Sequence, residues 1–363
     1  MIKTTPNLMP LLLAALLLSV TLPGCAALKK HPPAKGAPAA AAPMPAPAPL
    51  PKPMTGQATV ISFIDEMVAK HDFQRAELVA LFEKVQPRER IIQIMTAPAE
   101  GKPWNKYRPI FVNEARISGG VDFWRENSEA LARAEQQYGV PAEIIVAIIG
   151  VETRYGGNMG GFTVIDALAT LAFDYPPRAA YFRSELEQFL LLTREEKLDP
   201  LAPKGSYAGA MGEAQFMPSS YRNYSVDFDG DGRRDLWNST SDAIGSVANY
   251  LSGYGWQRAQ PIAALAQVTG DSYQSVLDQK LVKPTRSITE FRTHGVQPQS
   301  PLDKDQLASL LRFETDADDE LWLGLDNFYV ITRYNHSHRY AMAVYQLSQE
   351  ILARHQRLMS GAK

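Results

Sequence analysis

Glu152 is the residue of this chain best suited to donate a proton, because it is a carboxyl group at the end of an apolar run. The run reads Ile144-Ile145-Val146-Ala147-Ile148-Ile149-Gly150-Val151. Burial against aliphatic side chains disfavours the charged form and raises the pKa of a carboxyl group, which keeps it protonated near neutral pH. A glutamic acid in that state is a candidate general acid. A structural alternative stays open, in which Glu152 is paired with Arg154 or Arg178.

The element that must position Glu152 is a helix, which we predict from about Pro141 to Arg154. Proline is favoured in a first helical turn, and the acid Glu143 suits the positive end of the helix dipole. At about 100° per residue, the steps from Glu143 to Glu152 amount to roughly half a turn, so the two carboxyl groups face opposite sides. We therefore expect Glu143 to reach water and Glu152 to be buried.

A second group of residues that could bind a ligand lies in the segment over 205–221. Small residues over 209–212 let the backbone and a ligand approach closely, and Gln215 offers both a donor and an acceptor. That chemistry suits the amide of an N-acetyl sugar. The alternative is a glycine-rich turn followed by a helix capped near Ser219 and Ser220.

The segment over 227–235 predicts a calcium loop, with oxygen ligands at alternate positions and glycine where the chain turns sharply. Its twelfth position is Asn238 rather than glutamate, so Asp242 is the better candidate to close a longer loop. The predicted ligands are Asp227, Asp229, Asp231, Arg233 and Asp242. We expect structural calcium here; an acidic turn of low affinity is the alternative. No organic cofactor is expected.

The N-terminal part of the chain differs in composition from the globular part that follows it. Residues 1–24 have the layout of a signal peptide, and Cys25, the only cysteine among 363 residues, follows directly. This resembles a bacterial lipobox, in which the signal is removed and Cys25 is lipidated; an ordinary signal peptide with a chance cysteine is the alternative. Ala26 favours the periplasmic face of the outer membrane, by resemblance to sorted lipoproteins. The alanine- and proline-rich residues up to 56 predict an extended tether.

The composition excludes several classes of function. A net charge of −2 and a pI near 6.3 show no overall excess of basic residues, so nucleic acid is not an expected partner. With one cysteine, disulfides and cysteine-zinc sites are excluded.

Apolar periodicity predicts a mainly helical protein. Further helices are predicted from Gln57 through Val68, from a cap at Asp72 through Phe82, and over 110–117, 121–138, 180–192, 242–254 and 339–354. The segment over 260–315 differs, because it contains β-rich pieces at 280–282 and 291–296 and several prolines. We predict a small α+β insertion there.

Two motifs together resemble a known family. They are Gly150-Val151-Glu152-Thr153-Arg154-Tyr155-Gly156-Gly157 and the segment from Gly205 to Tyr221 that includes Ala208-Gly209-Ala210-Met211-Gly212. The pattern is similar to the lysozyme-like lytic transglycosylases of glycoside hydrolase family 103. The resemblance covers nearly everything from Gln57 to the C-terminus, together with the lipoprotein leader.

The resemblance implies roles for individual residues. Glu152 matches the single catalytic acid/base, and Ser206 and Gln215 match polar groups that line the glycan cleft. Arg178 matches one member of an arginine pair, whereas Pro177 replaces the other. Aromatic and amide positions of the groove are matched by Tyr107, Tyr250, Tyr334, Asn335 and Tyr340. From the residues alone, each tyrosine could equally pack in the core with a tethered hydroxyl.

The resemblance also implies a reaction and an architecture. Glu152 would cleave the bond between N-acetylmuramic acid and N-acetylglucosamine in peptidoglycan without water, with formation of 1,6-anhydro ends. A hydrolytic muramidase and a non-catalytic peptidoglycan-binding lipoprotein are the alternatives. Other cell-wall enzymes are candidate partners. We expect a mainly α (α+β) fold with a lysozyme-like core, divided into a leader (1–24), a lipidated tether (25–56), a helical domain (57–135), the catalytic core (136–258), the α+β insertion (259–325) and a C-terminal segment (326–363).

Overall fold

The structure is a computed structural model that describes residues 54–96, 102–278 and 283–361. Cys25, the predicted signal peptide and most of the predicted tether lie outside these ranges, as does the predicted β-rich piece over 280–282. Within the described residues, no helix combines the length and the apolar character that crossing a membrane requires.

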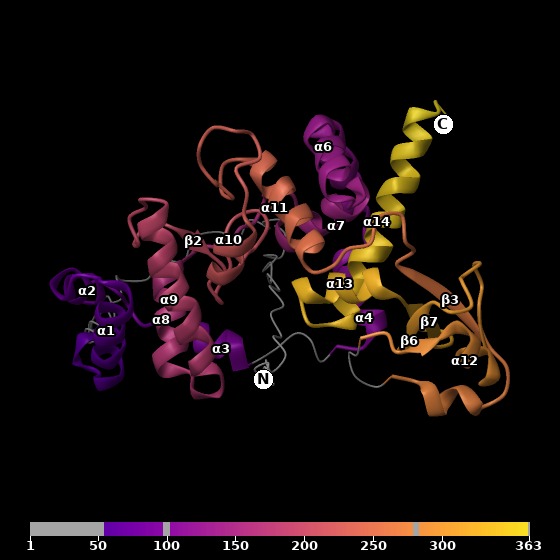
Figure 1. The fold of residues 1–363 in the computed structure, drawn as a ribbon, viewed down its shortest axis with the longest axis horizontal. Helices are drawn as coiled ribbons and strands as arrows, with labels where there is room; N and C mark the ends of the chain where they lie inside the picture. Colours follow the sequence, from indigo (N-terminus) through magenta and orange to yellow (C-terminus); the bar gives the residue numbers. More distant parts are fainter. Residues whose placement is uncertain (1–53, 97–101, 279–282, 362–363) are drawn as a thin grey trace, which may run out of the picture.

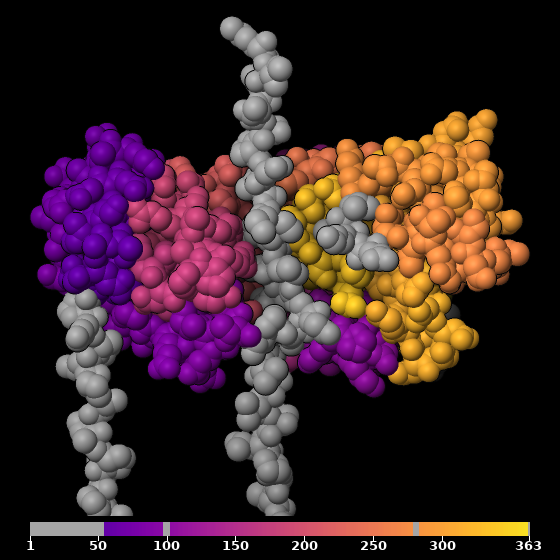
Figure 2. All heavy atoms as spheres, turned by 90° about the horizontal axis from the view of Figure 1, so that it is seen from below, coloured from indigo at the N-terminus to yellow at the C-terminus, as the bar shows by residue number. Residues whose placement is uncertain are grey.

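Helices form one end and the centre of an elongated molecule, and a small sheet forms the other end (Figure 1). Figure 2 shows the first helices and the sheet region at opposite ends of a space-filling view. The helices are α1 (Ala58–His71), α2 (Arg75–Phe82), α3 (Glu89–Thr96), α4 (Trp104–Phe111), α5 (Glu114–Glu126), α6 (Ser128–Tyr138), α7 (Ala142–Thr153), α8 (Val164–Asp174), α9 (Ala179–Glu195), α10 (Pro218–Tyr224), α11 (Thr240–Gly253), α12 (Ile288–Thr293), α13 (Asp326–Tyr334) and α14 (His338–Met359). Short 3-10 turns are η1 (Met54–Gly56), η3 (Pro176–Arg178) and η4 (Ser272–Val276). The predicted mainly α fold is confirmed.

The predicted helix that carries Glu152 is α7, and it lies at the centre of the fold. Ala142 and all residues from Ile144 to Thr153 are buried. A helix that is apolar on all sides must be surrounded by other elements. α7 packs against α5, α6, α11 and α14, and Figure 1 shows α6, α11 and α14 around it. The sequence of α7 therefore places Glu152 inside the protein rather than on its surface.

The sheet region is the predicted α+β insertion. Strands β3 (Ala263–Val268), β4 (Arg286–Ser287), β5 (Val296–Pro298), β6 (Leu307–Phe313) and β7 (Glu320–Gly324) form an antiparallel sheet in the order β4-β6-β7-β3-β5. Its apolar residues, such as Phe291 of α12 and Leu310 of β6, form a small cluster apart from the main core. A second, two-stranded sheet pairs β1 (Phe162–Thr163) with β2 (Lys204–Gly205) and leads into the glycine-rich loop.

Two predicted helices are wrong because asparagines interrupt them. The predicted helix over 110–117 is broken between α4 and α5, where the side chain of Asn113 caps α5 by accepting a backbone N–H bond at 3.1 Å. The predicted helix over 121–138 is divided at Asn127, between α5 and α6. The Asn127 side chain donates to the Phe123 carbonyl oxygen at 2.9 Å. Side chains that bond to nearby backbone groups favour helix ends over helix interiors.

Three boundary predictions are also corrected. Asp72 does not begin the second helix; it ends α1 in the left-handed conformation with φ 56°, and α2 follows Gln74. The predicted β piece over 291–296 begins as α12, which Ser287 caps. Ser219 does not cap α10, which begins one residue earlier and has Met217 at its N-cap position. Apolar periodicity locates helix boundaries poorly, because the residues that cap a helix are polar and are not part of the apolar pattern.

Candidate active site

Glu152 is the last residue but one of α7, and its side chain is 9% exposed. The hydroxyl of Tyr340, from α14, donates a hydrogen bond to Oε1 of Glu152 at 2.6 Å. Burial raises the pKa of Glu152 from its usual 4.5 to about 7, and the Tyr340 hydrogen bond offsets part of that rise. Near neutral pH both protonation states of this carboxyl group are therefore accessible at small cost in free energy.

Tyrosine, rather than the arginine of the structural alternative, is the hydrogen-bond partner of Glu152. Arg154 is the C-cap of α7 in the left-handed conformation, with φ 55°. The guanidinium of Arg178 lies over the rings of Tyr181 and Phe182, at 4.8 and 5.0 Å from their centroids. No arginine contributes to the pKa of Glu152, which burial and Tyr340 determine. This environment fits a proton donor better than a structural ion pair.

The C-terminal end of α7 is locked in place by Tyr155. Its hydroxyl donates to the Arg116 carbonyl oxygen at 2.7 Å, and Nε of Arg116 donates in turn to the Gly150 carbonyl oxygen at 3.0 Å. The Tyr155 ring lies so close to Gly150 that a Cβ there would meet the hydroxyl oxygen at 2.5 Å. The sequence analysis does not single out Tyr155, although this aromatic residue lies within the motif that contains Glu152.

The glycine-rich loop is attached directly to this end of α7. The hydroxyl of Thr153 donates to the Glu213 carbonyl oxygen at 3.0 Å. From the other side, the hydroxyl of Tyr334 in α13 donates to the Ala214 carbonyl oxygen at 2.6 Å. Because Thr153 follows Glu152 in the chain, these two bonds hold the loop beside the candidate acid. The structure thus brings together the two motifs that the sequence places about 60 residues apart.

The side-chain amide of Gln215 is oriented by hydrogen bonds from its nitrogen to backbone carbonyl groups. Its backbone has φ 50°, in the left-handed region. Its Nε2 donates to the Met159 carbonyl oxygen at 3.2 Å and to the Gly212 carbonyl oxygen at 2.9 Å. The two amide hydrogens are thereby used, and the oxygen Oε1 is the end that remains for a ligand. The sequence predicted a donor and an acceptor; the structure favours an acceptor.

Ser206 shapes the loop. Its hydroxyl oxygen accepts hydrogen bonds from the backbone N–H groups of Ala208 at 3.3 Å and Ala210 at 3.0 Å, and the residue is 3% exposed. These bonds use the lone pairs of the oxygen and leave the hydroxyl hydrogen available to donate.

Three of the predicted tyrosines, Tyr250, Tyr334 and Tyr340, form a connected aromatic cluster. The rings of Tyr334 and Tyr340 are nearly parallel at 9° with centroids 6.5 Å apart, and Tyr250 of α11 meets Tyr334 edge-on at 4.8 Å. The hydroxyl of Tyr250 donates to the Arg333 carbonyl oxygen at 2.6 Å. Tyr107 of α4 is buried, and after burial, Glu152 and Tyr334 it contributes to the raised pKa of Tyr340. Packing and function are thus compatible for these side chains, because hydroxyl bonds hold the rings of Tyr250, Tyr334 and Tyr340 in a cluster that reaches Glu152.

Arg178 is the last residue of η3, and Asn335 directly follows Tyr334 of the cluster. Asn335 follows α13 and is buried between Tyr334 and the start of α14. Burial first, then Arg333 and Arg178, lower the pKa of the half-buried His336 to about 4. The two arginines therefore give this side of the site a positive potential. His336 was not predicted as a site residue.

The predicted calcium loop brings three of its acids together. One carboxylate oxygen from each of Asp227, Asp229 and Asp242 lies within 4.8 Å of the others. Asp242 closes the loop, because its oxygens accept the backbone N–H groups of Phe228 at 2.7 Å and Asp235 at 2.8 Å. Asp231 is outside the group; its carboxylate accepts the N–H of Arg233 at 2.8 Å.

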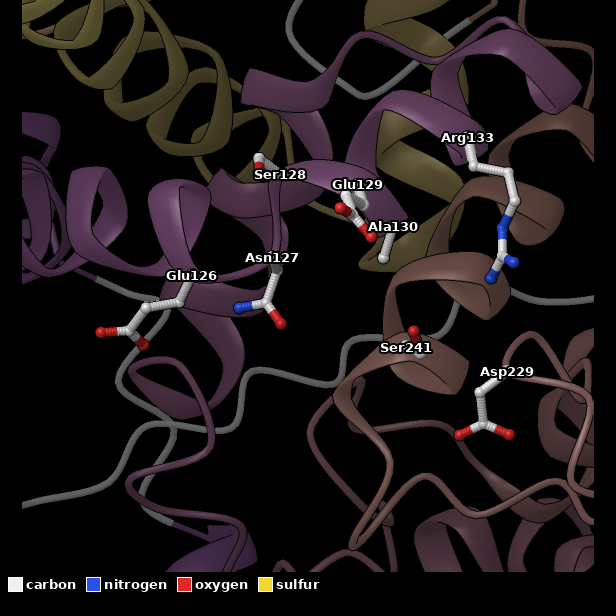
Figure 3. A pocket seen from close by; sticks show the side chains of 8 residues that line it. All are labelled: Glu126, Asn127, Ser128, Glu129, Ala130, Arg133, Asp229 and Ser241. Atoms are coloured by element: carbon white, nitrogen blue, oxygen red, sulfur yellow. The ribbon is translucent and has the colours of Figure 1, made fainter.

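The donor set fits a hard divalent cation. All three side chains offer oxygen only, which suits calcium rather than a softer metal. Three carboxylates this close repel one another, and Arg133 is the basic residue that eases the charge on Asp229. A polar hollow of about 560 Å³ lies beside Asp229, between the α5–α6 junction and the start of α11 (Figure 3). That hollow is distinct from the Glu152 site.

The comparisons with known proteins agree with this geometry. The sequence profile of the family described as "Transglycosylase SLT domain" matches residues 56–349. Membrane-bound lytic murein transglycosylase B of Escherichia coli (strain K12) is 48% identical over 299 residues, which are 80% of this chain and 81% of that protein. The chain therefore belongs to the transglycosylase SLT domain family. It is a lytic transglycosylase, as the resemblance predicted.

Solved structures extend the likeness to the fold. The Escherichia coli lytic transglycosylase Slt35 in complex with calcium has a TM-score of 0.77 and 45% identity, covering 84% of this chain and 96% of that one. SltB3 from Pseudomonas aeruginosa in complex with NAG-anhNAM-pentapeptide has a TM-score of 0.70 and 30% identity, covering 80% of this chain and 78% of that one. The predicted lysozyme-like helical core is confirmed.

Proposed function

We propose that this lytic transglycosylase, which acts on peptidoglycan, cleaves the β-1,4 bond between N-acetylmuramic acid and N-acetylglucosamine with Glu152 as its single acid/base. The observation that carries the proposal is the state of Glu152, which is buried, held by Tyr340, and has a pKa raised to about 7. A carboxyl group with that pKa can give a proton in one step and take one in the next at neutral pH.

In the first step, Glu152 donates its proton to the glycosidic oxygen, and the bond from that oxygen to C1 of the muramoyl residue breaks. The acetamido oxygen of the same residue stabilises the cation that develops at C1, as in substrate-assisted glycosidases. Oε1 of Gln215 can accept the acetamido N–H, because the Gln215 amide hydrogens are already used by carbonyl groups. Ser206 can donate from its hydroxyl to the sugar.

In the second step, the Glu152 carboxylate takes the proton of the muramoyl C6 hydroxyl, and the C6 oxygen bonds to C1. The 1,6-anhydro ring closes, Glu152 is again protonated, and no water is consumed. The tyrosine cluster supports this outcome because its rings occupy the space beside Glu152 and limit the entry of water. The complex of SltB3 with NAG-anhNAM-pentapeptide is a further support, from a relative.

The masses of the muropeptides released from purified sacculi test the proposal. A transglycosylase releases products one water lighter than the reducing forms. Reducing products would instead establish the hydrolytic muramidase, in which water takes the place of the C6 hydroxyl. Binding to sacculi without any release would establish the non-catalytic lipoprotein.

Calcium is expected to stabilise the chain through the loop over 227–242. The support is the oxygen-only group of Asp227, Asp229 and Asp242 in this chain and the calcium complex of the similar Slt35. A ligand at a hundredfold excess over its Kd stabilises a fold by about 2.7 kcal/mol. We expect Tm to rise by several degrees when calcium is added to chelator-treated protein. The same addition should leave the Tm of Asp227→Asn unchanged.

The control for the calcium prediction is Asp271→Asn, an exposed acid in the sheet region that should keep the full calcium response. An equal Tm with and without calcium in the parent chain would overturn the proposal. Calcium-dependent stabilisation that survives Asp227→Asn would place the ion elsewhere.

Lipidation of Cys25 and attachment to the outer membrane, facing the periplasm, complete the proposed function. The similar Escherichia coli protein is named membrane-bound, and the sequence places the one cysteine directly after the signal-peptide layout. Replacing Cys25 with serine should move the protein from the outer-membrane fraction to the soluble periplasmic fraction, because an acyl anchor is lost. A Cys25→Ser chain that still fractionates with the outer membrane would refute the anchor.

A further inference from the structure

Tyr254 has an exposed aromatic ring that no predicted role explains. It is the C-cap residue of α11, and it is 41% exposed. Most of the other large apolar side chains with comparable exposure in the described residues, Leu307, Leu358 and Met359, lie in the sheet region or at the end of α14. A single exposed apolar residue needs no explanation by itself, so what matters is which residues Tyr254 contacts.

The ring of Tyr254 contacts two other tyrosine rings in tilted orientations. Its centroid is 4.6 Å from that of Tyr250, with 36° between the planes, and 5.4 Å from that of Tyr224, with 39°. Tyr224 and Tyr250 also contact each other, edge-on at 4.9 Å. Each of the three rings therefore contacts the other two. These contacts restrict the side-chain rotation of Tyr254 and hold its ring in one orientation at the surface.

This group is continuous with the active site. Tyr250 contacts Tyr334 at 4.8 Å, Tyr334 stacks on Tyr340 at 6.5 Å, and Tyr340 donates to Glu152 at 2.6 Å. The rings of Tyr340, Tyr334, Tyr250 and Tyr254 thus form a row that begins at the acid and ends at the surface. The three inner members are predicted groove residues; the outer member is not.

Residues of a second element flank the outer end of the row. Burial first, then Glu185 and finally Tyr254 raise the pKa of Tyr181 in α9, so Tyr254 and Tyr181 lie within range of electrostatic interaction. The guanidinium of Arg178 lies over the Tyr181 ring at 4.8 Å. The ring of Tyr254 therefore contacts Tyr250, a predicted groove residue of α11, and it lies within electrostatic range of Tyr181, whose ring contacts the predicted residue Arg178.

We propose that Tyr254 is an outer sugar-binding platform of the glycan groove, against which a pyranose ring stacks beyond the sugars held at Glu152. The inference rests on the proposed function. Sugar rings carry C–H groups on their faces and hydroxyls at their edges, so a braced aromatic face with polar groups beside it is a suitable surface. A protein partner would require a contiguous apolar patch, whereas here one ring is exposed in a row that leads to the acid.

The test uses the full chain in detergent with Glu152→Gln as the parent, so that bound glycan is not turned over. Affinities are measured by calorimetry for N-acetylglucosamine oligomers of increasing length. Adding Tyr254→Ala should weaken binding of the long oligomers roughly fivefold to tenfold, as expected for one lost aromatic contact. The shortest oligomers that the parent binds should be unaffected, because they do not reach Tyr254.

Two matched variants complete the test. Tyr254→Phe keeps the ring and should bind like the parent, and Leu307→Ala removes a side chain of similar exposure (42%) on β6 and should also have no effect. Equal affinities of parent and Tyr254→Ala at every length would overturn the inference. A loss of equal size for short and long oligomers would also overturn it, since Tyr254 would then act through Tyr250. If the parent bound no oligomer while the chain with Glu152 intact still released anhydro muropeptides from sacculi, the inference would fail and the proposed function would stand; absence of both binding and release would overturn the proposed function as well.

Discussion

Glu152→Gln is expected to lower kcat for glycan cleavage by about a thousandfold or more. A positioned acid or base contributes about 10² to 10⁴ in rate, and here one group serves as both. The amide of glutamine can neither protonate the glycosidic oxygen nor accept the proton of the C6 hydroxyl. The loss is measured as the rate of release of 1,6-anhydro muropeptides from sacculi, counted by mass spectrometry.

Glutamine should preserve the fold, because it has the shape of glutamate and its amide oxygen can still accept the hydrogen bond from Tyr340. Glycan binding should therefore remain. Glu143→Gln is the matched control, since Glu143 is a half-buried acid in the first turn of the same helix. It should retain turnover. Substantial release of anhydro products by Glu152→Gln would show that another group supplies the proton.

The pH dependence gives an independent readout of the same group. The first step needs Glu152 protonated, and its pKa is about 7, so kcat/KM should fall as the pH rises above that value. The Tyr340 hydrogen bond lowers this pKa. Tyr340→Phe should therefore move the alkaline limb to higher pH. A limb that stays in place in Tyr340→Phe would argue that a different group controls the profile.

The free energy of unfolding should depend on pH because of the same raised pKa of Glu152. A carboxyl group whose pKa is higher in the folded state than in the unfolded state gives stability below pH 4.5 that is lost as the pH rises through about 7. A shift of this size amounts to roughly 3 kcal/mol at most. Glu152→Gln does not titrate, so at pH 8 it should be more stable to unfolding than the parent chain. At pH 4 the two should be nearly equal.

Much of this site could be predicted from the sequence because its signals are local. The apolar run before Glu152 is long and has no polar face, so burial of the helix and of its carboxyl group follows from composition alone. The cation-binding loop over 227–242 can also be predicted from the sequence, since aspartates that alternate with glycines are typical of few structures other than such a loop. Even there the structure adds detail, because carboxylate oxygens of Asp227, Asp229 and Asp242 come together, whereas that of Asp231 is not part of the group.

The contacts between distant residues could not be predicted by periodicity. The bond from Tyr340 to Glu152 joins residues 188 positions apart; the family resemblance indicated Tyr340 as a groove residue but not this bond. The orientation of the Gln215 amide depends on the Met159 carbonyl group, 56 positions away, as well as on the nearby Gly212 carbonyl group, so its role as an acceptor needed the structure. Helix boundaries failed at Asn113 and Asn127 for a related reason, because a side chain that bonds to the backbone can end a helix whose apolar pattern continues.

The position of Glu152 depends on how the end of α7 is held, and Gly150 is the residue that allows it. A Cβ at Gly150 would meet the hydroxyl oxygen, Cζ and Cε1 of Tyr155 at 2.5, 2.6 and 2.7 Å. These atoms belong to a ring that is anchored by its bond to the Arg116 carbonyl oxygen. The ring cannot move without breaking that bond, so a methyl group at position 150 must displace the helix end instead.

Gly150→Ala is therefore expected to lower the free energy of unfolding by about 1–3 kcal/mol, as overpacking does. It should also reduce turnover by about tenfold to a hundredfold, because Glu152 lies two residues further along the same helix and its placement is changed. Thermal unfolding and anhydro-muropeptide release measure the two effects. Gly56→Ala is the control, since no atom lies within 4 Å of its Cβ position and neither quantity should change.

A double-mutant cycle with Tyr155→Ala tests the cause. Tyr155→Ala alone removes a large, mostly buried ring and should cost about 3–5 kcal/mol through the cavity it leaves. In the double variant the methyl group introduced by Gly150→Ala enters that cavity and meets no ring. The cost of the pair should therefore be smaller than the sum of the two single costs by at least about 1 kcal/mol. Additive costs would show that Gly150 is required for some property of the α7 backbone rather than for contact with Tyr155.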